Sequence, residues 1–222
     1  MPDIVIYLGN KAYSSWSLRG WLACKLTGLP FREEVHAMDT PDWKAWIATR
    51  SPSGKVPYVT VDGAPLWESL AIGEHLAELN PAAFWPVDVA ARAHARSISS
   101  EMHAGFGELR KAMWMNVRRR FPGKGRTPGA LADIARIEAL WDDTRKRYGA
   151  GGPFLFGARF GFADAMYAPV VARLRTWEPE IGPATKAYIE AVWNHPFMAD
   201  WVKAAEAEPW TIAKYEDPDR AR

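Results

Sequence analysis

Hydrophobic positions follow two different periods in the two parts of the chain. In roughly the first eighty residues, short apolar runs rich in β-branched residues indicate strands, and stretches with an apolar residue every three or four positions indicate helices. Beyond residue 87 almost every apolar run has the helical period. The expected strands are 4–8, 31–35 and 58–61, with helices over 15–27 and from Glu68 onward. The pattern therefore predicts a mixed α/β part followed by an all-helical part.

The order of elements in the first part is typical of an α/β sandwich. Strand, helix and strand would form a parallel half, and the strands and helix that follow would form an antiparallel half. Asp62-Gly63 is a strong turn dipeptide directly after the apolar run 58–61, which predicts a hairpin there.

The remainder of the chain is expected to be helical. Residues 80–86 contain two prolines and no periodicity, which is typical of a linker. The predicted domains are therefore 1–80 and 87–222, joined by a linker at 81–86. Helices are expected over 87–120, over 128–148, from near 162–164, over 185–193 and over 197–205.

A proline stands where a sheet strand should begin. Pro57 directly precedes Tyr58, the first residue of the predicted third strand. Because proline cannot donate a hydrogen bond to a sheet ladder, it belongs at the beginning of a strand, at an edge or at a functional site. Cis peptide bonds occur almost only before proline, and a cis Val56-Pro57 bond fits such a position.

Composition is that of an ordinary globular chain. With 222 residues and 48% hydrophobic content, the chain can bury a substantial core. A formal net charge of +2 is too small to predict nucleic acid or an anionic membrane as a partner. Arg118, Arg119, Arg120, Lys124 and Arg126 form a local basic cluster, which we interpret as a solvated helix end.

Cysteine usage indicates a reducing compartment. Cys24 is the single cysteine, so an internal disulfide is not possible. The first residues show no features of a secretory signal, and no apolar run reaches the roughly eighteen residues of a membrane span. A cytoplasmic location without membrane attachment is expected.

Three motifs in order resemble the cytosolic glutathione S-transferases of the serine type, which include the zeta, theta and tau classes. They are Ser14-Ser15-Trp16-Ser17-Leu18-Arg19 after the first strand, Val56-Pro57, and Glu68-Ser69. The resemblance implies a thioredoxin-like α/β N-terminal domain and an all-α C-terminal domain. It also implies glutathione as co-substrate, no metal, a small electrophilic second substrate and a homodimer. In that family the valine before the cis-proline pairs with the cysteinyl part of glutathione, and the acid-serine pair holds the γ-glutamyl end.

A hydroxyl near the start of the first helix can activate a thiol without a base. Lowering the pKa of a thiol from about 8.5 by about two units requires roughly 2.7 kcal/mol. One hydrogen bond to a charged acceptor contributes about 1.5–3 kcal/mol, and a helix N-terminus adds about 0.3–1. By the resemblance Ser14 is the first candidate for this donor and Ser15 the second, whereas Ser17 is interpreted as a helix cap.

Glu68 and Ser69 open a helix, a position that suits a ligand carboxylate. Backbone N–H groups there attract an anion, the Ser69 hydroxyl adds a donor, and the Glu68 carboxylate can pair with an ammonium group. Lys55 could reach the glycyl carboxylate of glutathione, although a lysine in an exposed loop is at least as often solvated. Together with Val56 and Pro57, these residues form the predicted glutathione site.

By the resemblance, the long helix after the linker would form a wall of the electrophile site. Glu101 and His103 are two positions apart and cannot share one helical face, so they are no ready-made acid-base pair. Gly161 stands where the family usually has Ser or Thr as a helix cap, which costs only a few tenths of a kcal/mol. The candidate wall residues are Glu101, His103, Arg110, Met113 and Trp114.

The leading hypothesis is a glutathione transferase of the detoxifying kind, which activates glutathione as thiolate for attack on an electrophilic, largely apolar small molecule. A second hypothesis is a zeta-like, glutathione-dependent cis-trans isomerase of a dienone acid. Trp16 counts against it, because those enzymes have a cysteine in this neighbourhood. A third is a non-catalytic protein of the same fold that serves binding or assembly, which predicts weak affinity for glutathione.

Overall fold

The N-terminal part of the chain forms a four-stranded mixed sheet. The computed structural model describes residues 1–219, so the end of the predicted second domain, 220–222, lies outside the described residues. β1 pairs in parallel with β2 and antiparallel with β3, which pairs antiparallel with β4. The strands, in the sheet order β2-β1-β3-β4, are β1 (Ile4–Leu8), β2 (Arg32–Val35), β3 (Tyr58–Val61) and β4 (Ala64–Trp67). The predicted strands and their parallel and antiparallel halves are confirmed.

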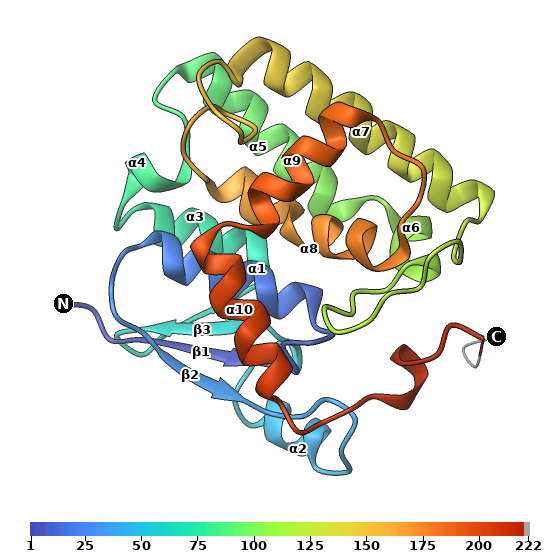
Figure 1. The fold of residues 1–222 in the computed structure, drawn as a ribbon. Helices are drawn as coiled ribbons and strands as arrows, with labels where there is room; N and C mark the ends of the chain where they lie inside the picture. Colours follow the sequence, from blue (N-terminus) through green and yellow to red (C-terminus); the bar gives the residue numbers. More distant parts are fainter. Residues whose placement is uncertain (220–222) are drawn as a thin grey trace.

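Helices lie on both sides of this sheet (Figure 1). α1 (Ser15–Leu26) and α3 (Ser69–Ala77) pack against each other on one side, and α2 (Trp43–Ala48) lies on the other. Ile6 of β1 and Val59 of β3 are fully buried, because alternate strand residues face the helical layer. This is the thioredoxin-like α/β layout that the resemblance implied.

The rest of the chain is helical, and α7 has the predicted bounds. The predicted helices near 162, at 185–193 and at 197–205 are also present. Within the linker predicted at 81–86, residues 81–84 form one short helix, and the division into domains at this point stays a prediction. The helices are α4 (Pro81–Phe84), α5 (Val89–Ala104), α6 (Gly107–Ala112), α7 (Pro128–Tyr148), α8 (Phe162–Trp177), α9 (Pro183–Trp193) and α10 (Pro196–Ala207), followed by the 3₁₀ turn η1 (Ala213–Tyr215).

The single helix predicted over 87–120 is wrong. α5 ends at Ala104, Phe106 adopts a left-handed conformation with φ 60°, and the short α6 follows. Glycines at 105 and 107 weaken the helix at this point. Phe106 is nevertheless buried, so the apolar stripe that suggested one helix is preserved by packing across the break.

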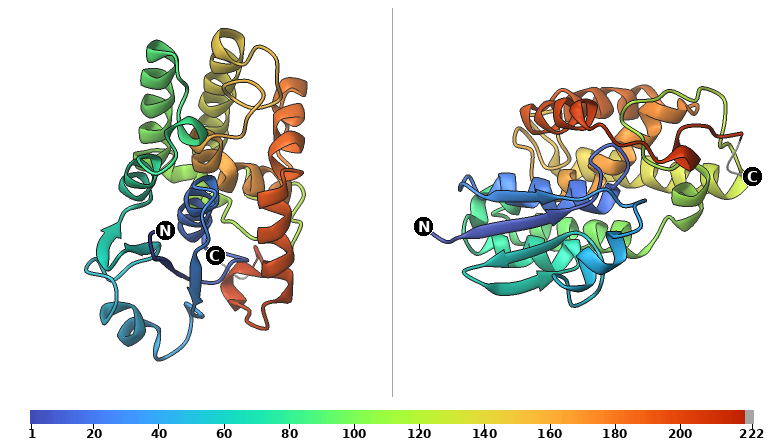
Figure 2. Two further views of the ribbon diagram at one scale, coloured as in Figure 1. Left: turned by 90° about the vertical axis from the view of Figure 1, so that its left-hand side faces the viewer. Right: turned by 90° about the horizontal axis from the view of Figure 1, so that it is seen from below.

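α1 and α8 form the centre of the contact between the sheet-bearing part and the helical part. Figure 2 shows the helices standing above the sheet, with α1 between the two parts. Nearly every residue of α8 is buried, and its core is continuous with the sheet side of α1. The start of α1, which carries the candidate serines, is therefore held by both parts of the molecule.

Asp164 organises the start of α8. Its carboxylate accepts hydrogen bonds from the backbone N–H groups of Gly161 (2.9 Å) and Leu155 (3.1 Å) and from the Tyr188 hydroxyl (2.9 Å). Burial raises the pKa of Asp164 to about 6, against the effect of these hydrogen bonds. The helix thus begins normally at Gly161, as expected for a glycine cap.

The basic cluster around residues 118–126 is not at a helix end, which corrects its interpretation. This segment has no helical structure, and two of its arginines bind the C-terminal segment, whereas Arg120 and Arg126 donate to carbonyl groups at the end of α8. Arg118 donates to the carbonyl of Glu208 (3.1 Å), and Arg119 pairs with the carboxylate of Glu216 (2.5 Å). Arg118 and Arg119 therefore hold the C-terminal segment in place.

This C-terminal segment, residues 208–216, is bound to the turn that precedes α1. The carboxylate of Glu208 accepts hydrogen bonds from the backbone N–H groups of Lys11 (2.7 Å) and Ala12 (3.2 Å). The Tyr13 hydroxyl donates to Glu216 (2.5 Å). Residues near the end of the chain thus fix the backbone immediately before Ser14.

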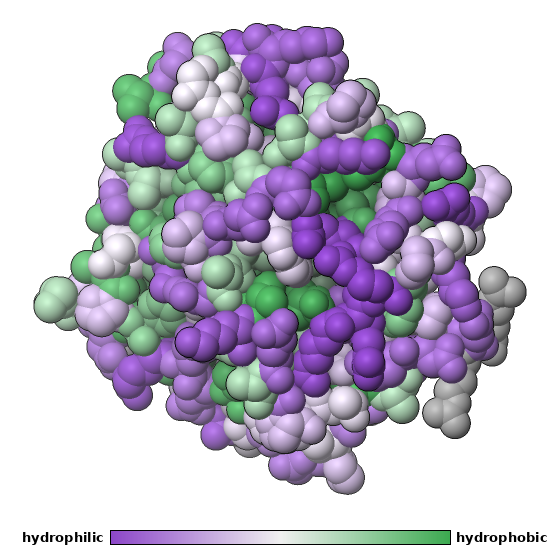
Figure 3. Space-filling model, viewed as in Figure 1, coloured by the Kyte–Doolittle hydropathy of each residue, from purple (hydrophilic) through white to green (hydrophobic). Residues whose placement is uncertain are grey.

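The face seen in Figure 1 is predominantly hydrophilic, with small separate hydrophobic patches (Figure 3). Within residues 1–219, no helix combines the length and apolar character needed to cross a bilayer.

Candidate active site

The predicted glutathione residues line one cavity of about 250 Å³. It lies where the start of α1, the segment before β3 and the end of the β3–β4 hairpin meet. Its lining residues are Trp16, Ser53, Lys55, Val56, Pro57, Glu68 and Ser69. Residues from three separate motifs are thus brought together as the resemblance implied. Trp16 and Ser53 were not among the predicted binding residues.

Pro57 is buried at the floor of this region, directly before β3. The Val56-Pro57 peptide bond is cis, as expected. Gly20 of α1 allows the helix to approach the proline closely, because a Cβ atom at this glycine would lie 2.6 Å from Cβ of Pro57. Packing of α1 against the proline therefore depends on a glycine at position 20.

Glu68 and Ser69 connect the hairpin to α3. β4 ends at Trp67, and Glu68 has a positive φ of 64°, which turns the chain into the helix. A residue other than glycine rarely adopts this conformation, and such residues concentrate at functional sites. Ser69 is the first residue of α3, so the unpaired N–H groups of the first helical turn lie next to its hydroxyl.

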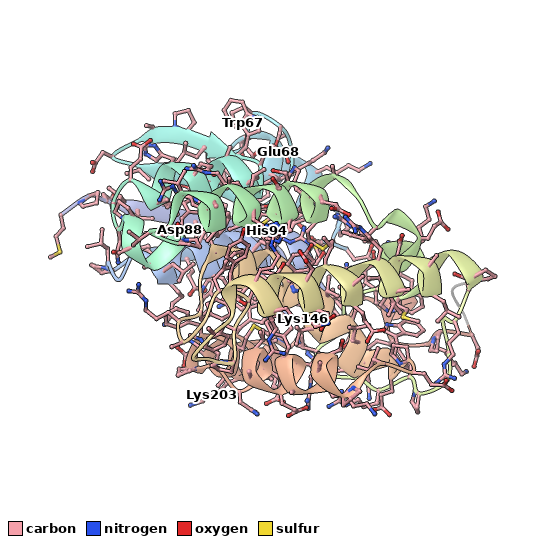
Figure 4. The ribbon with its side chains drawn as sticks, turned by 90° about the horizontal axis from the view of Figure 1, so that it is seen from above. Trp67, Glu68, Asp88, His94, Lys146 and Lys203 are labelled. Carbon is pink, nitrogen blue, oxygen red and sulfur yellow. The ribbon has the colours of Figure 1, made fainter. Side chains whose placement is uncertain are left out.

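His103 of α5 completes the site from the helical part of the molecule. Its Nε2 lies 3.5 Å from a carboxylate oxygen of Glu68, and its Nδ1 lies 3.5 Å from Oγ of Ser69. Figure 4 shows the end of the hairpin, with Trp67 and Glu68 labelled, beside α5. The imidazole ring of His103 also meets the indole of Trp16 edge-on, with ring centroids 5.3 Å apart. From the sequence His103 is predicted only as a wall residue, because its contact with the hairpin joins residues far apart in the chain.

Electrostatics around His103 favour the neutral imidazole. Burial lowers its pKa, the Glu68 carboxylate raises it, and the positive charges of Arg19 and Arg110 lower it further. Glu101, two positions earlier, pairs instead with Arg136 (2.9 Å), which agrees with the expectation that Glu101 and His103 do not share a face.

The candidate serines lie at the start of α1, but neither is among the residues that line the cavity. Ser14 caps the helix: its Oγ accepts the N–H of Ser17 (3.2 Å) and donates to Oγ of Ser17 (2.8 Å). Ser15 Oγ accepts a hydrogen bond from Arg173 (3.1 Å). The choice between Ser14 and Ser15 as donor to a thiolate therefore stays open. Rotation of a hydroxyl about its C–O bond is enough to redirect its proton.

The Tyr13 hydroxyl and the Cys24 thiol are not available for thiol chemistry at this cavity. The hydroxyl of Tyr13, the residue before Ser14, donates to Glu216, and burial together with this bond raises its pKa to about 12. Cys24 is fully buried in α1, and burial raises the pKa of its thiol. Among residues 1–219, no group of three His, Cys, Asp or Glu residues is arranged to hold a metal ion.

A mixed sheet with a cis-proline before β3, an acid-serine pair opening α3 and an all-helical second part define the architecture of a glutathione transferase. The family description "Glutathione S-transferase, N-terminal domain" matches residues 13–79, and "Glutathione S-transferase, C-terminal domain" matches residues 93–204. The chain belongs to the glutathione S-transferase family.

Several curated relatives carry the name of an isomerase. A maleylacetoacetate isomerase of Rhizobium meliloti (strain 1021) is 31% identical over 194 residues, which cover 76% of this chain and 81% of the relative. A probable maleylacetoacetate isomerase of Caenorhabditis elegans is 27% identical over 184 residues, covering 81% and 82%. A glutathione S-transferase-like protein, OpS6, of Beauveria bassiana (strain ARSEF 2860) is 25% identical over 223 residues, covering 94% and 93%.

Solved structures agree on the fold. A glutathione transferase homologue from Burkholderia GL BGR1 with bound glutathione superposes with a TM-score of 0.70 at 23% identity, covering 93% of this chain and all of the other. A theta class glutathione S-transferase from Xanthomonas axonopodis pv. citri with glutathione bound gives a TM-score of 0.64 at 23% identity, covering 91% and 98%.

Proposed function

We propose that this protein is an enzyme that binds glutathione in the cavity beside Pro57 and uses its thiolate as a nucleophile. The observation that carries the proposal is the convergence of Val56, Glu68 and Ser69 on one cavity. The backbone of Val56 would pair with the cysteinyl part of glutathione. Glu68 would hold the ammonium of the γ-glutamyl end, and Ser69 with the first turn of α3 would hold its carboxylate. Lys55 is the candidate partner for the glycyl carboxylate.

In this proposal Ser14, or Ser15, donates a hydrogen bond to the sulfur of glutathione. The hydroxyl stabilises the anion and is not itself a nucleophile. A bond of about 1.5–3 kcal/mol at the N-terminus of α1 is enough to lower the pKa of the thiol by one to two units. The thiolate then forms a bond with an electrophilic carbon, and the electron pair leaves with the displaced group.

An isomerase function is the second candidate, and the names of the Rhizobium and Caenorhabditis relatives support it. There the thiolate would add reversibly to a cis-dienone acid and leave after rotation about the weakened bond. Trp16 stands where such enzymes have a cysteine, and its indole lines the cavity. Separate assays for isomerisation of maleylacetone and for conjugation distinguish the two reactions.

Calorimetry with glutathione tests the proposal most directly. We expect binding in the wild type, weaker binding in Glu68→Gln, and no change in the matched variant Glu74→Gln, because the Glu74 carboxylate of α3 pairs with Arg96 of α5 and is not among the residues that line the cavity. Absence of glutathione binding in the folded wild type would favour the non-catalytic alternative. By family we further propose a homodimer in the cytoplasm, which sedimentation and cell fractionation can check.

A further inference from the structure

Trp16 forms one side of the glutathione cavity. Its side chain belongs to the lining of this cavity, together with the glutathione residues Val56, Glu68 and Ser69. The residues on either side of it, 11–15 and 17–20, are all buried, whereas Trp16 is partly exposed. The side chain that the start of α1 presents at the cavity is therefore the Trp16 indole.

Three groups from three helices contact this indole. The guanidinium carbons of Arg19 of α1 and Arg110 of α6 lie 4.6 Å and 4.7 Å from its ring centroid. The imidazole of His103 of α5 meets it edge-on. Because a cation over the face of an indole is attracted by the ring electrons, both arginines stabilise the ring where it lies.

Each of these three groups is in turn held by another part of the molecule. Arg19 is 1% exposed and donates to the carbonyl of Met166 of α8 (2.9 Å). Arg110 donates to the carbonyl of His103 (3.1 Å), and the His103 ring lies 3.5 Å from the Glu68 carboxylate. The indole therefore cannot turn away from the cavity unless several fixed side chains move with it.

The residues expected to wall the electrophile site do not provide a free surface beside the cavity. His103 and Arg110 are in contact with the indole. The other three are engaged elsewhere: Glu101 pairs with an arginine of α7, Met113 is fully buried, and Trp114 donates to a carbonyl of η1. The indole thus lies between the glutathione cavity and the wall residues nearest to it.

The cavity itself is small. Pockets that enclose a single drug-sized ligand measure about 300–1,000 Å³. The cavity lined by Trp16 measures about 250 Å³, so bound glutathione would fill it. A second molecule would have to reach the sulfur from the margin of the cavity, beside the indole.

We propose that Trp16 limits the size of the second substrate. The inference rests on the proposed function and narrows the electrophile to a small, slender molecule without a bulky group next to its reacting carbon. A bulky group would have to displace the indole together with the arginines packed on it, and forcing packed groups apart is unfavourable. Trp16 is in this sense a specificity-determining residue, which acts through shape.

Two electrophiles of similar chemistry and different bulk test the proposal. Allyl bromide and 4-tert-butylbenzyl bromide both lose bromide as the carbon–sulfur bond to glutathione forms, and the thiol proton passes to water. After division by the uncatalysed rates, the wild type should favour allyl bromide in kcat/KM by about tenfold or more. Trp16→Ala should remove this preference by raising kcat/KM for the bulky bromide.

Two further variants serve as controls. Trp16→Phe keeps a smaller ring and should retain part of the preference, which also decides the matter if Trp16→Ala does not fold. Trp193→Ala should retain all of it, because Trp193 is likewise a partly exposed indole beneath an arginine (4.6 Å) but does not line the cavity. Equal use of both bromides by the wild type would overturn the proposal. So would an equal change for both bromides in folded Trp16→Ala.

Binding of the finished conjugates separates this inference from the proposed function. Calorimetry with S-methylglutathione and S-(4-tert-butylbenzyl)glutathione requires no turnover. We expect the wild type to bind the methyl conjugate about tenfold more tightly, and Trp16→Ala to bind both alike. If neither glutathione nor a conjugate binds to the wild type, the proposed function fails and this inference fails with it. If glutathione and both conjugates bind equally well, the size limit fails and the glutathione site stands.

Discussion

The carboxylate of Glu68 lies 3.5 Å from Nε2 of His103, and so links the end of the β3–β4 hairpin to the last turn of α5. The same histidine approaches the Ser69 hydroxyl, so one imidazole from the helical part touches both members of the acid-serine pair. The Glu68 carboxylate, which would hold the ammonium of glutathione, thus also lies beside the titratable imidazole of His103.

Protonation of His103 should weaken glutathione binding, because an imidazolium would compete with the ligand ammonium for Glu68. The pKa of His103 lies below its ordinary value of 6.5, so the neutral form prevails at neutral pH. We expect the KM for glutathione to be constant near neutral pH and to rise once the pH falls below 6.5. His103→Gln should remove this rise, and steady-state kinetics across the range provide the measurement. A variant with the wild-type profile would contradict the prediction.

Replacement of the two candidate serines should separate their roles. Ser14→Ala is expected to raise the pKa of bound glutathione by about one to two units, since it removes a donor to the thiolate. Because Ser14 also caps α1, the same variant should lose about 1 kcal/mol of unfolding free energy. The ultraviolet absorbance of the thiolate against pH reports the first effect, and Ser14→Thr, which keeps the hydroxyl, is the control. A shift seen in Ser15→Ala alone would transfer the role to Ser15.

A methyl group at Gly20 should disturb the glutathione site, although Gly20 itself does not line the cavity. The added carbon would lie 2.6 Å from Pro57, so α1 or the proline segment must move. We expect Gly20→Ala to cost about 1–3 kcal/mol of stability, as overpacking usually does, and to raise the KM for glutathione. Gly107→Ala is the matched control, because a Cβ atom at Gly107 has no atom within 4 Å. Equal behaviour of the two variants in denaturation and kinetics would disprove the argument.

Removal of the Asp164 carboxylate should destabilise the helical part. Asp164→Ala leaves the Tyr188 hydroxyl and the N–H groups of Leu155 and Gly161 buried without this acceptor. Unsatisfied buried donors of this kind cost about 1–3 kcal/mol each, and we expect a total loss of about 3 kcal/mol or more at neutral pH. Asp142→Ala, on the exposed side of α7, should change stability by no more than about 0.5 kcal/mol. Urea denaturation of both variants gives the comparison.

The same carboxyl group predicts a pH dependence of stability. Its pKa is raised from 3.8 to about 6 in the folded protein, so the folded state binds this proton more tightly than the unfolded state. The bound proton therefore adds stability that is fully present below pH 3.8 and is lost as the pH rises through about 6, so that only the contribution of the hydrogen bonds remains at neutral pH. The advantage of the wild type over Asp164→Ala should shrink across this window by up to about 3 kcal/mol. An advantage that grows with pH would contradict the assignment.

Local sequence was sufficient to predict most of the elements, and the family resemblance named the residues of the candidate site. Each of these signals lies within a few residues: the apolar run before Asp62-Gly63 predicts the hairpin, and Pro57 and the acid-serine pair are short motifs. The structure brings Pro57, Glu68 and Ser69 to one cavity. Periodicity failed at Gly105 and Phe106, since buried residues keep their spacing across a break that only the backbone conformation reveals.

Contacts between distant segments could not be predicted in the same way. His103 meets Glu68 only because α5 packs beside the hairpin, and nothing in either motif specifies that approach. The approach of Arg110 to Trp16 likewise depends on how α1 and α6 meet. Such contacts arise from tertiary packing between elements. Sequence periodicity predicts each element separately and does not predict how two elements pack against each other.

The C-terminal segment is hydrogen-bonded to the backbone of Lys11 and Ala12, so proteolytic cleavage of this segment should affect the candidate site. Glu208 and Glu216 are among the last described residues, yet they hold the turn from which α1 starts. Proteolytic trimming of this tail would therefore loosen the serine-bearing turn while the helical bundle remains intact. A sample clipped in this way would keep its helical circular dichroism signal and bind glutathione more weakly.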